Sequence, residues 1–399
     1  MGGEVQHDHI TRVIRAAAEH DLTTLEECVN EYSFPDCKVV DVQDPETGFS
    51  PLHAAILSCR SSVNGHGSAK LDNEDAGSSA IRYLLENGAI WNQLDKNDET
   101  PGCLAYRLGL LELYQLMVDA GVRAEMILSR LEEYERMEDD DMDKEDKPEE
   151  EQHIAGNDQS SSSKPQDDVI DSVGDHQPDV NTSAYLSSTL SLSSSKLVDD
   201  QQNGVMMGWE SGIMKQSADH LLTTPGMRVL NIGFGMGIID SHIQNHPSKP
   251  ARHYIVEAHP DVLKDMESKG WMSKTGVEVH RGRWQDVLPE LVADGETFDA
   301  IYFDTFAESY AEFREFFTEH VMALLDQSGR WSFFNGMGAD RQISYDIYQK
   351  VVEMDLFEAG FEVDWEDVEL PKLDQEWDGV RRKYWNIDSY RLPVCKFMD

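Results

Sequence analysis

The sequence predicts an α/β protein in which a seven-stranded, doubly wound sheet follows a smaller all-α repeat domain. Three observations support this fold class. Short apolar stretches alternate with helical patterns after residue 205, a proline-initiated helical motif recurs near the N-terminus, and an acidic, serine-rich stretch separates the two regions. We therefore expect a repeat domain over residues 1–130, a disordered linker over 131–183 and the sheet domain over 184–399.

Two segments near the N-terminus begin alike, with Ser-Pro or Thr-Pro before an Ala- and Leu-rich helical pattern. They are GFSPLHAAILSC (48–59) and DETPGCLAYRLGLLELYQLMVDAG (98–121). Proline suits the first turn of a helix, because its missing N–H would have no partner there. The first copy resembles the T-P-L-H-x-A signature of ankyrin repeats, in which His53 is structural, and AIRYLLENGAIWN (80–92) resembles the second helix of such a unit.

The spacing of the two copies differs from that of a regular ankyrin array. They start 50 positions apart, at Ser50 and Thr100, whereas the usual period is about 33 residues. We attribute the excess to an inserted polar loop over 61–77. A further helix pair over 10–32 brings the count to about three units, which is near the minimum for a stable stack. Ankyrin stacks bind proteins, and we expect this domain either to recognise a protein or simply to pack on its neighbour.

The chain carries a formal net charge of −42. Between residues 131 and 180, 19 Asp and Glu stand against 4 Lys and Arg, and too few apolar residues remain to form a core. This composition predicts disorder from about 135 to 183, either as a spacer or as a segment that holds a basic substrate nearby. Because the charge repels phosphates and anionic lipid, we expect a basic protein partner and no direct nucleic-acid or membrane binding.

Several familiar site patterns are missing from the sequence. The five cysteines form no C-x-x-C pair, which disfavours a disulfide framework and a zinc site, and no histidine pattern suggests metal ligands, so we expect no metal. There is no phosphate-binding G-K-[ST] loop and no G-x-S-x-G elbow. Without an apolar run of about eighteen residues or a leader segment, the sequence predicts a soluble protein inside the cell.

The C-terminal domain is predicted from alternating strand and helix patterns. Five short apolar stretches predict buried parallel strands: 227–234, 253–259, 277–282, 298–306 and 330–338. Helical spacing of apolar residues predicts helices between and after them: 237–246, 260–270, 284–293, 310–329 and 344–360. Two more extended segments, 361–370 and 384–394, predict a hairpin at the sheet edge that adds a seventh, antiparallel strand.

The stretch VLNIGFGMGIID (229–240) places Gly233, Gly235 and Gly237 where the first strand turns into its helix. Glycines there let the backbone pass close to a ligand. Glu257 follows Gly233 by 24 residues and ends the second strand, where a carboxylate can accept hydrogen bonds from both hydroxyls of a ribose. The combination predicts a nucleoside cofactor in a Rossmann-like domain.

Nicotinamide dinucleotides and S-adenosylmethionine both use this arrangement of strand, glycines and acid. Dinucleotide sites usually place the third glycine one residue later than this sequence does, and the C-terminal hairpin is typical of methyltransferases, so the pattern favours S-adenosylmethionine. Trp284 lies just after the third strand. It either contacts the adenine with its ring or packs in the core.

Five segments carry a resemblance to a known family. They are MMGWESGIM (206–214), VLNIGFGMGI (229–238), YIVEAHPDVL (254–263), GRWQDV (282–287) and FDAIYFDTF (298–306). Their succession resembles that of guanidinoacetate methyltransferase. With an ankyrin-like front end and an acidic linker, the whole chain resembles the fungal protein-arginine N5-methyltransferases, also called type IV or arginine N-delta methyltransferases. The resemblance is strong over 205–399 and rests on architecture over 1–130.

The resemblance implies both a cofactor site and an acceptor site. The residues implied at the S-adenosylmethionine site are Tyr185, Met206, Asn231, Ile232, Gly233, Phe234, Gly235, Met236, Glu257, Ala258, His259, Trp284, Gln285 and Asp304. Asn231 departs from the small-molecule enzyme, which has a glutamate there. Glu210 and Asp304 are implied as the catalytic acids beside the acceptor. For Asp304 the end of the fourth strand is a ligand position in such sheets, with a helix cap as the alternative.

The two acids suit a guanidinium acceptor. A guanidinium has a pKa above about 12 and a delocalised charge, so its nitrogens are poor nucleophiles until the cation is fixed in place. Carboxylates paired with the terminal nitrogens would leave the internal nitrogen facing the sulfonium methyl for an in-line displacement. Either acid can take the released proton.

We therefore expect methylation of the internal guanidino nitrogen of a protein arginine. The alternatives are a methyltransferase of a free guanidino compound such as guanidinoacetate, and a non-enzymatic ankyrin adaptor. The family resemblance further implies a ribosomal protein substrate and a location in cytoplasm and nucleus. A monomer is the favoured oligomeric state.

Overall fold

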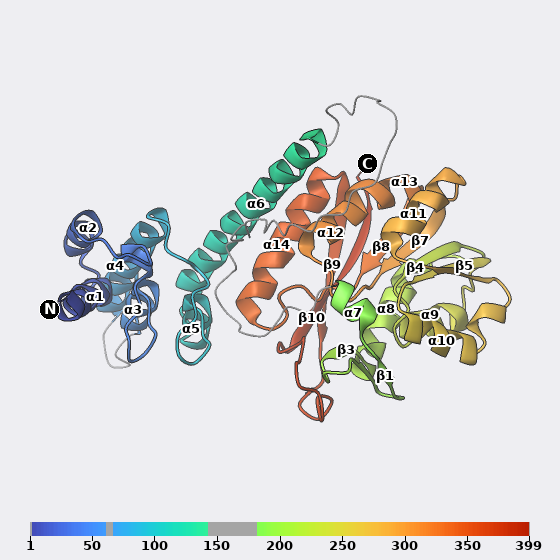
Figure 1. Ribbon diagram of the computed structural model, residues 1–399, viewed down its shortest axis with the longest axis horizontal. Helices are drawn as coiled ribbons and strands as arrows, with labels where there is room; N and C mark the ends of the chain where they lie inside the picture. Colours follow the sequence, from blue (N-terminus) through green and yellow to red (C-terminus); the bar gives the residue numbers. More distant parts are fainter. Residues whose placement is uncertain (1, 61–66, 143–181, 399) are drawn as a thin grey trace, which may run out of the picture. The chain divides into compact units, whose positions relative to one another are not determined.

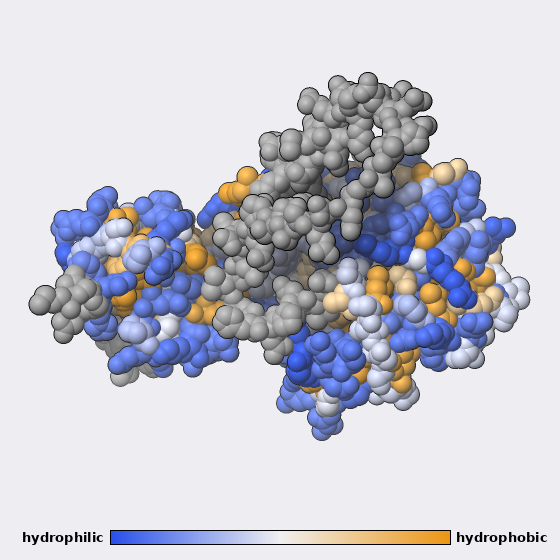
Figure 2. Space-filling view, in the orientation of Figure 1, coloured by the Kyte–Doolittle hydropathy of each residue, from blue (hydrophilic) through white to orange (hydrophobic). Residues whose placement is uncertain are grey.

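The computed structural model describes residues 2–60, 67–142 and 182–398 (Figure 1). The chain divides into two compact units, Met1–Gln177 and Pro178–Asp399, each of which is described by itself below. Within the described ranges, no helix is both long enough and apolar enough to cross a membrane. The face of each unit visible in Figure 2 is largely hydrophilic, which agrees with the large excess of Asp and Glu.

The described part of the N-terminal unit is built from helices. They are α1 (Gly2–Ala18), α2 (Leu22–Glu31), α3 (Pro51–Ser58), α4 (Gly67–Glu86), α5 (Pro101–Arg107) and α6 (Leu111–Met142), with a single 3-10 turn, η1 (Val39–Asp41). Both predicted proline-initiated helices are present, as α3 and α5. Ser50 and Thr100 cap them, since each side chain accepts a hydrogen bond from the backbone N–H three residues later.

His53 joins the starts of the two proline-initiated helices. Its ring is fully buried, and Nδ1 accepts a hydrogen bond from the N–H of Ser50 at 3.2 Å. On the other side Nε2 donates to the carbonyl of Glu99 at 3.0 Å. Burial lowers the pKa of His53, which favours the neutral ring that can accept on one nitrogen and donate on the other. The predicted structural role of His53 is confirmed.

The helices of this unit extend further than the sequence predicted. Residues 67–77 of the predicted polar loop belong to α4, while 61–66 lie outside the described residues. The helix passes close to α3, because a side chain at Gly77 would collide with Sγ of Cys59. Helix α6 likewise continues through 131–142, where Glu and Met favour helix over coil despite the charge. The remaining linker residues 143–181 lie outside the described residues, so their disorder stays a prediction.

The C-terminal unit contains the predicted seven-stranded sheet. Its strands are β4 (Arg228–Ile232), β5 (Arg252–Glu257), β6 (Val277–Arg281), β7 (Phe298–Phe303), β8 (Leu325–Phe333), β9 (Phe361–Glu369) and β10 (Ser389–Phe397). Their order is β6-β5-β4-β7-β8-β10-β9. The first five are parallel, and β10 runs antiparallel to both β8 and β9, as the predicted hairpin requires. The direction of winding reverses between β4 and β7, where such sheets bind ligands.

Helices cover both faces of this sheet (Figure 1). One face packs against α8 (Ser211–Leu221), α9 (Ile238–Asn245) and α10 (Pro260–Ser268). The other packs against α11 (Trp284–Ala293), a continuous stretch of α12 (Tyr310–Glu315), π-helical η4 (Phe316–Val321) and α13 (Met322–Leu324), and α14 (Gln342–Glu358). The predicted helix over 310–329 therefore ends early. Leu325 pairs with Phe298 of β7 instead, so sheet pairing overrides the local helical pattern.

A small second sheet was not predicted. It consists of β1 (Ser191–Leu192), β2 (Lys196–Val198) and β3 (Gly204–Met207), preceded by α7 (Thr182–Ser187) and followed by η2 (Gly208–Glu210). Backbone hydrogen bonds tie it to the connection between β9 and β10: Arg381 N–H donates to Gln202 and Gly204 N–H donates to Arg382. We call residues 182–210 the cap segment, because it carries Met206 and Glu210 to the ligand end of the main sheet.

Candidate active site

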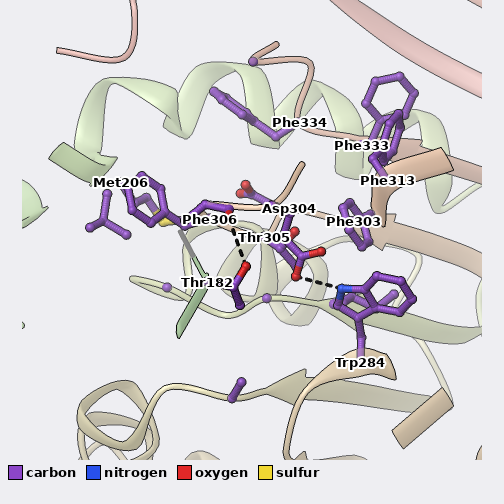
Figure 3. Close-up of a pocket in the computed structure, with 18 of the residues that line it drawn as sticks. Thr182, Met206, Trp284, Phe303, Asp304, Thr305, Phe306, Phe313, Phe333 and Phe334 are labelled. Atoms are coloured by element: carbon purple, nitrogen blue, oxygen red, sulfur yellow. Dashed lines mark hydrogen bonds between the residues drawn. The ribbon is translucent and has the colours of Figure 1, made fainter. Parts of the chain in front are cut away.

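A cavity of about 300 Å³ lies at the carboxyl ends of β4, β5, β7 and β8. Most of the predicted site residues line it: Tyr185, Met206, Glu210, Ile232, Gly233, Gly235, Glu257, Ala258, Trp284 and Asp304. The others lie beside it and not on its lining: Asn231, Phe234, Met236, His259 and Gln285. Figure 3 shows Met206 and Trp284 on opposite sides of the cavity, with Asp304 between them.

The glycine loop is held tightly against the end of β7. Gly233 has φ +90°, and a Cβ placed on it would collide with the carbonyl oxygen of Asp304. The N–H of Asp304 in turn donates to the carbonyl of Ile232 at 2.8 Å. Only glycine fits at position 233, because both the dihedral angle and the close approach exclude a side chain.

Glu257 ties the end of β5 to the same loop. Its Oε2 accepts hydrogen bonds from the N–H groups of Phe234 (2.9 Å) and Gly235 (3.4 Å), and its Oε1 accepts from His259 (2.6 Å). Burial raises the pKa of this carboxyl, although these hydrogen bonds work in the opposite direction. Each carboxylate oxygen has two acceptor sites. Oε2 therefore has both of its sites occupied, and Oε1 keeps at most one site for a ribose hydroxyl beside the His259 N–H.

Asn231 holds the glycine loop through hydrogen bonds of its side chain. The side chain is fully buried, and Nδ2 donates both to Asp240 Oδ1 and to the carbonyl of Gly233, each at 2.9 Å. Asp240 in turn lies 3.2 Å from His253 Nε2, again with no exposure. Asn231 therefore links the loop to a buried polar cluster.

The remaining cofactor-loop residues pack around the cap segment. Met206 Sδ accepts the N–H of Met236 at 3.2 Å, so the Met206 side chain lies over the loop. His259 Nε2 donates to the carbonyl of Tyr185 at 3.0 Å. Phe234 is buried against Trp271. These contacts place the predicted residues close together, although the roles assigned to them remain predictions.

Trp284 is mostly a core residue. It is 2% exposed, and its ring packs edge-on against Phe303 and Phe316. Its Nε1 donates to Oε1 of Glu308 at 2.8 Å, which is the dashed line that leaves Trp284 in Figure 3. Only part of Trp284 borders the cavity. Both polar atoms of the neighbouring Gln285 side chain are buried without a partner among the described residues.

Glu210 is positioned by two donors on one oxygen. The residue is 2% exposed, and its Oε1 accepts the N–H of Met207 at 2.8 Å and the hydroxyl of Tyr384. Tyr384 comes from the connection between β9 and β10 and also lines the cavity. Tyr384 was not predicted as a site residue, because its contact with Glu210 joins two segments far apart in the chain.

The lining acids have little positive charge near them. Burial raises the pKa of Glu210, and Asp304 raises it further; burial and Asp240 raise the pKa of Asp304. Among the described residues that line the cavity, only Arg283 is basic, and it lies 3.5 Å from Glu312. A cation entering beside Glu210 and Asp304 would favour their ionised forms. The site is therefore suited to a positively charged group.

Two polar residues that follow Asp304 were likewise not predicted as site residues. Thr305 and Glu308 line the cavity, and Thr305 Oγ1, Asp304 Oδ2 and Glu308 Oε2 are buried without partners among the described residues. The strand-end rule that identified Asp304 applies equally to the stretch DTFAES that follows β7. An aromatic wall completes the cavity, formed by Phe303, Phe306, Phe313, Phe333 and Phe334 (Figure 3).

This lining fits S-adenosylmethionine. The unpartnered oxygens lie where a polar ligand can satisfy them, and the glycine loop lets backbone approach that ligand.

A separate group of possible metal ligands consists of Glu315, Glu319 and His320, whose ligand atoms lie within 4.8 Å of one another. Acidic groups of this kind do not by themselves identify a metal site, so the absence of a metal remains a prediction.

Known proteins include a matching family and several relatives of this chain. The family model of guanidinoacetate N-methyltransferase matches residues 193–389. Protein arginine N-methyltransferase 2 of Aspergillus fumigatus is 54% identical, covering 98% of this chain and 96% of its own length. The protein of that name from Aspergillus oryzae is 53% identical (98% and 97% covered), and that from Neurospora crassa is 43% identical (98% and 96%). A solved fibrillarin from Aeropyrum pernix with bound S-adenosyl-L-methionine is 17% identical, covers 47% of this chain and 76% of its own, and has a TM-score of 0.33.

Proposed function

This chain belongs to the family of fungal proteins called protein arginine N-methyltransferase 2, and from that premise we propose that it methylates the internal (δ, N5) guanidino nitrogen of an arginine within a protein. It is an S-adenosylmethionine-dependent methyltransferase, the activity class of its relatives. The finer proposal concerns which nitrogen receives the methyl group and what kind of molecule carries it.

The observation that carries the proposal is the pair of buried acids, Glu210 and Asp304, on one cavity. Both have a raised pKa because they are buried, and Asp304 Oδ2 has no partner among the described residues. A guanidinium offers five N–H donors and a permanent positive charge. It would satisfy the unpaired oxygen and supply the missing countercharge together.

The residues of the chain would orient the acceptor. Met207 and Tyr384 occupy Oε1 of Glu210, which leaves Oε2 to accept from a terminal guanidino nitrogen. Asp304 Oδ2 is available to the other terminal nitrogen. With both terminal nitrogens held, the internal nitrogen is the one left free to attack. S-adenosylmethionine, when bound, supplies an electrophilic methyl group on a sulfonium.

The same acids would take up the proton that the reaction releases. A carboxylate with a raised pKa is a better proton acceptor near neutral pH than an ordinary one. Asp304 and Glu210 are both raised, so either can accept this proton.

We further propose that the helical unit is an ankyrin-type module that engages the protein substrate. The support is the Ser50-Pro51 start of α3 and the buried His53, which bridges to Glu99. The net charge of −42 favours a basic partner, and the family resemblance suggests a ribosomal protein met in the cytoplasm or nucleus.

One alternative is transfer to a free guanidino acid, which the family-model match over 193–389 favours. Such a substrate carries a carboxylate. The cavity has four lining acids, Glu210, Glu257, Asp304 and Glu308, and a single basic residue, Arg283. A substrate carboxylate would be repelled by these acids and would find only Arg283 as a basic partner on the lining. An arginine side chain carries no carboxylate and would be attracted. We therefore favour a protein arginine.

The test is fragmentation mass spectrometry after the full-length protein has methylated a basic ribosomal protein fraction. We expect fragments that retain the methyl group on the internal nitrogen. Asp304→Asn serves as the inactive control. Methyl groups on terminal nitrogens would contradict the proposed site, and labelling of small metabolites alone would favour the alternative substrate.

A further inference from the structure

Glu308 is a buried acid that the transfer reaction leaves unused. It follows β7 by a few residues and lines the cavity. Trp284 Nε1 donates to its Oε1 at 2.8 Å, whereas Oε2 is buried and has no partner among the described residues. Burial raises the pKa of Glu308 to about 7. A fixed carboxylate with one unused oxygen inside a cavity requires a ligand that donates a hydrogen bond.

The surroundings of Glu308 indicate what kind of ligand this is. Trp284, Phe303, Phe313 and Phe333 pack on one another and line this end of the cavity, on the side away from Met206 (Figure 3). A flat heteroaromatic ring can lie against the cavity side of such a cluster. Of the groups that face the carboxyl, Glu312 and Glu315 are acidic and Arg283 is basic, so no net positive charge draws an anion there.

We propose that Glu308 recognises the exocyclic amino group of the cofactor's adenine. The Trp284 indole fixes the carboxylate through Oε1, and Oε2 accepts a hydrogen bond from the amine. The inference rests on the use of S-adenosylmethionine and is independent of which nitrogen is methylated. It makes Glu308, and not the neighbouring Gln285, the residue that distinguishes adenine from a base with a carbonyl at the same position.

The arrangement predicts what a single substitution does. In Glu308→Gln, the Trp284 N–H still requires an acceptor, so the amide oxygen takes the place of Oε1 and the NH₂ group takes the place of Oε2. A donor then faces the adenine amine, which is also a donor. The same NH₂ group would instead complement the carbonyl oxygen of hypoxanthine. The variant should therefore reverse the preference between the two bases.

The experiment is calorimetric binding of S-adenosylhomocysteine and its deaminated analogue, S-inosylhomocysteine, to the full-length protein. We expect the wild type to prefer the adenosyl compound by roughly tenfold, and Glu308→Gln to prefer the inosyl compound. Glu290→Gln, an exposed acid of α11 outside the cavity lining, is the matched control, and Gln285→Met tests the rival residue; both should keep the wild-type preference. Adenosyl binding should strengthen more in the wild type than in Glu308→Gln as pH rises through about 7, since the variant keeps only the other titrating acids of the cavity, Glu210 and Asp304 among them.

The proposal is overturned if Glu308→Gln keeps the adenosyl preference, or weakens both compounds equally, or if Gln285→Met loses the preference instead. If the wild type binds neither compound, the proposal is overturned, and so is the assignment of this cavity to S-adenosylmethionine. A protein that shows the reversal but methylates no arginine would contradict the proposed function alone.

Discussion

The Tyr384 hydroxyl donates to the oxygen of Glu210 that also accepts the N–H of Met207. Both hydrogen bonds favour the carboxylate form of Glu210, whereas burial and the nearby Asp304 oppose it. Tyr384 therefore positions the acid and moderates its pKa without itself having to touch the substrate. The connection between β9 and β10 thus takes part in forming the cavity.

Tyr384→Phe should lower kcat/KM by about tenfold, because one hydrogen bond to a charged group is lost. Removal of a donor to the carboxylate raises the pKa of Glu210 further, so the acid limb of the pH–rate profile should move to higher pH. Binding of S-adenosylhomocysteine should not change. Tyr254→Phe is the matched control, because it removes a hydroxyl that donates to Glu296 outside the cavity lining. An unshifted pH profile in Tyr384→Phe would show that Tyr384 is only a packing residue.

Asp304→Asn should reduce transfer by roughly 10²–10³-fold while cofactor affinity stays within a few-fold. The substitution removes the charge on the unpartnered Oδ2 and keeps the backbone bond to Ile232. Single-turnover rates and calorimetry separate the two effects. Asp340→Asn, whose carboxylate pairs with Arg341 at the surface, is the matched control. A large loss of cofactor affinity would assign Asp304 to the cofactor.

The buried acids should make the protein less stable as pH rises. Glu210, Asp304 and Glu308 have raised pKa values in the folded state, so the folded chain binds protons that the unfolded chain has released. Each group then lowers the free energy of unfolding as pH rises from its unfolded pKa near 4 to its folded pKa, by about 1.4 kcal/mol for each pH unit in between. Below that window the penalty is absent.

Urea denaturation of Glu210→Gln and the wild type from pH 5 to pH 8 checks this pH dependence. Followed by tryptophan fluorescence, the variant should gain stability relative to the wild type as pH increases, because it has no charge to bury. An exposed acid substituted in the same way, Glu362→Gln, should show a difference that does not vary with pH. A relative loss for Glu210→Gln would mean that the acid is stabilised by a partner as a carboxylate.

His53→Ala should destabilise the helical unit by about 2–4 kcal/mol, because it leaves the N–H of Ser50 and the carbonyl of Glu99 without their buried partner. Hydrogen exchange should accelerate in α3 and α5, with S-adenosylhomocysteine affinity unchanged. His7→Ala, an exposed histidine of α1, is the control. Unaltered exchange would show that the two helix starts are held by other contacts.

The cofactor loop could be predicted from the sequence because its signals are local. Gly233 ends a run of apolar strand residues, and Glu257 ends the next one, so strand order alone brings them to one edge. The same rule identified Asp304. Applied to every polar residue after β7, it would also have found Thr305 and Glu308.

Other features could not be predicted because distant segments decide them. Tyr384 and Glu210 are separated by 174 positions, and neither segment shows a local pattern for the contact. Leu325 lies in a helical pattern and becomes a strand residue because it pairs with Phe298. Residues 67–77 belong to α4, which approaches α3 at Gly77, and composition does not reveal such a contact.

Gly233 lies directly against the Asp304 carbonyl, so the glycine turn after β4 and the end of β7 are in backbone contact. No side chain lies between Gly233 and that carbonyl, so any larger residue at position 233 would have to push the end of β7, which carries Asp304, away from the glycine turn. The separation of the turn from Asp304 is thereby set by the backbone. Variation of the cavity lining that keeps this separation must therefore occur at other positions.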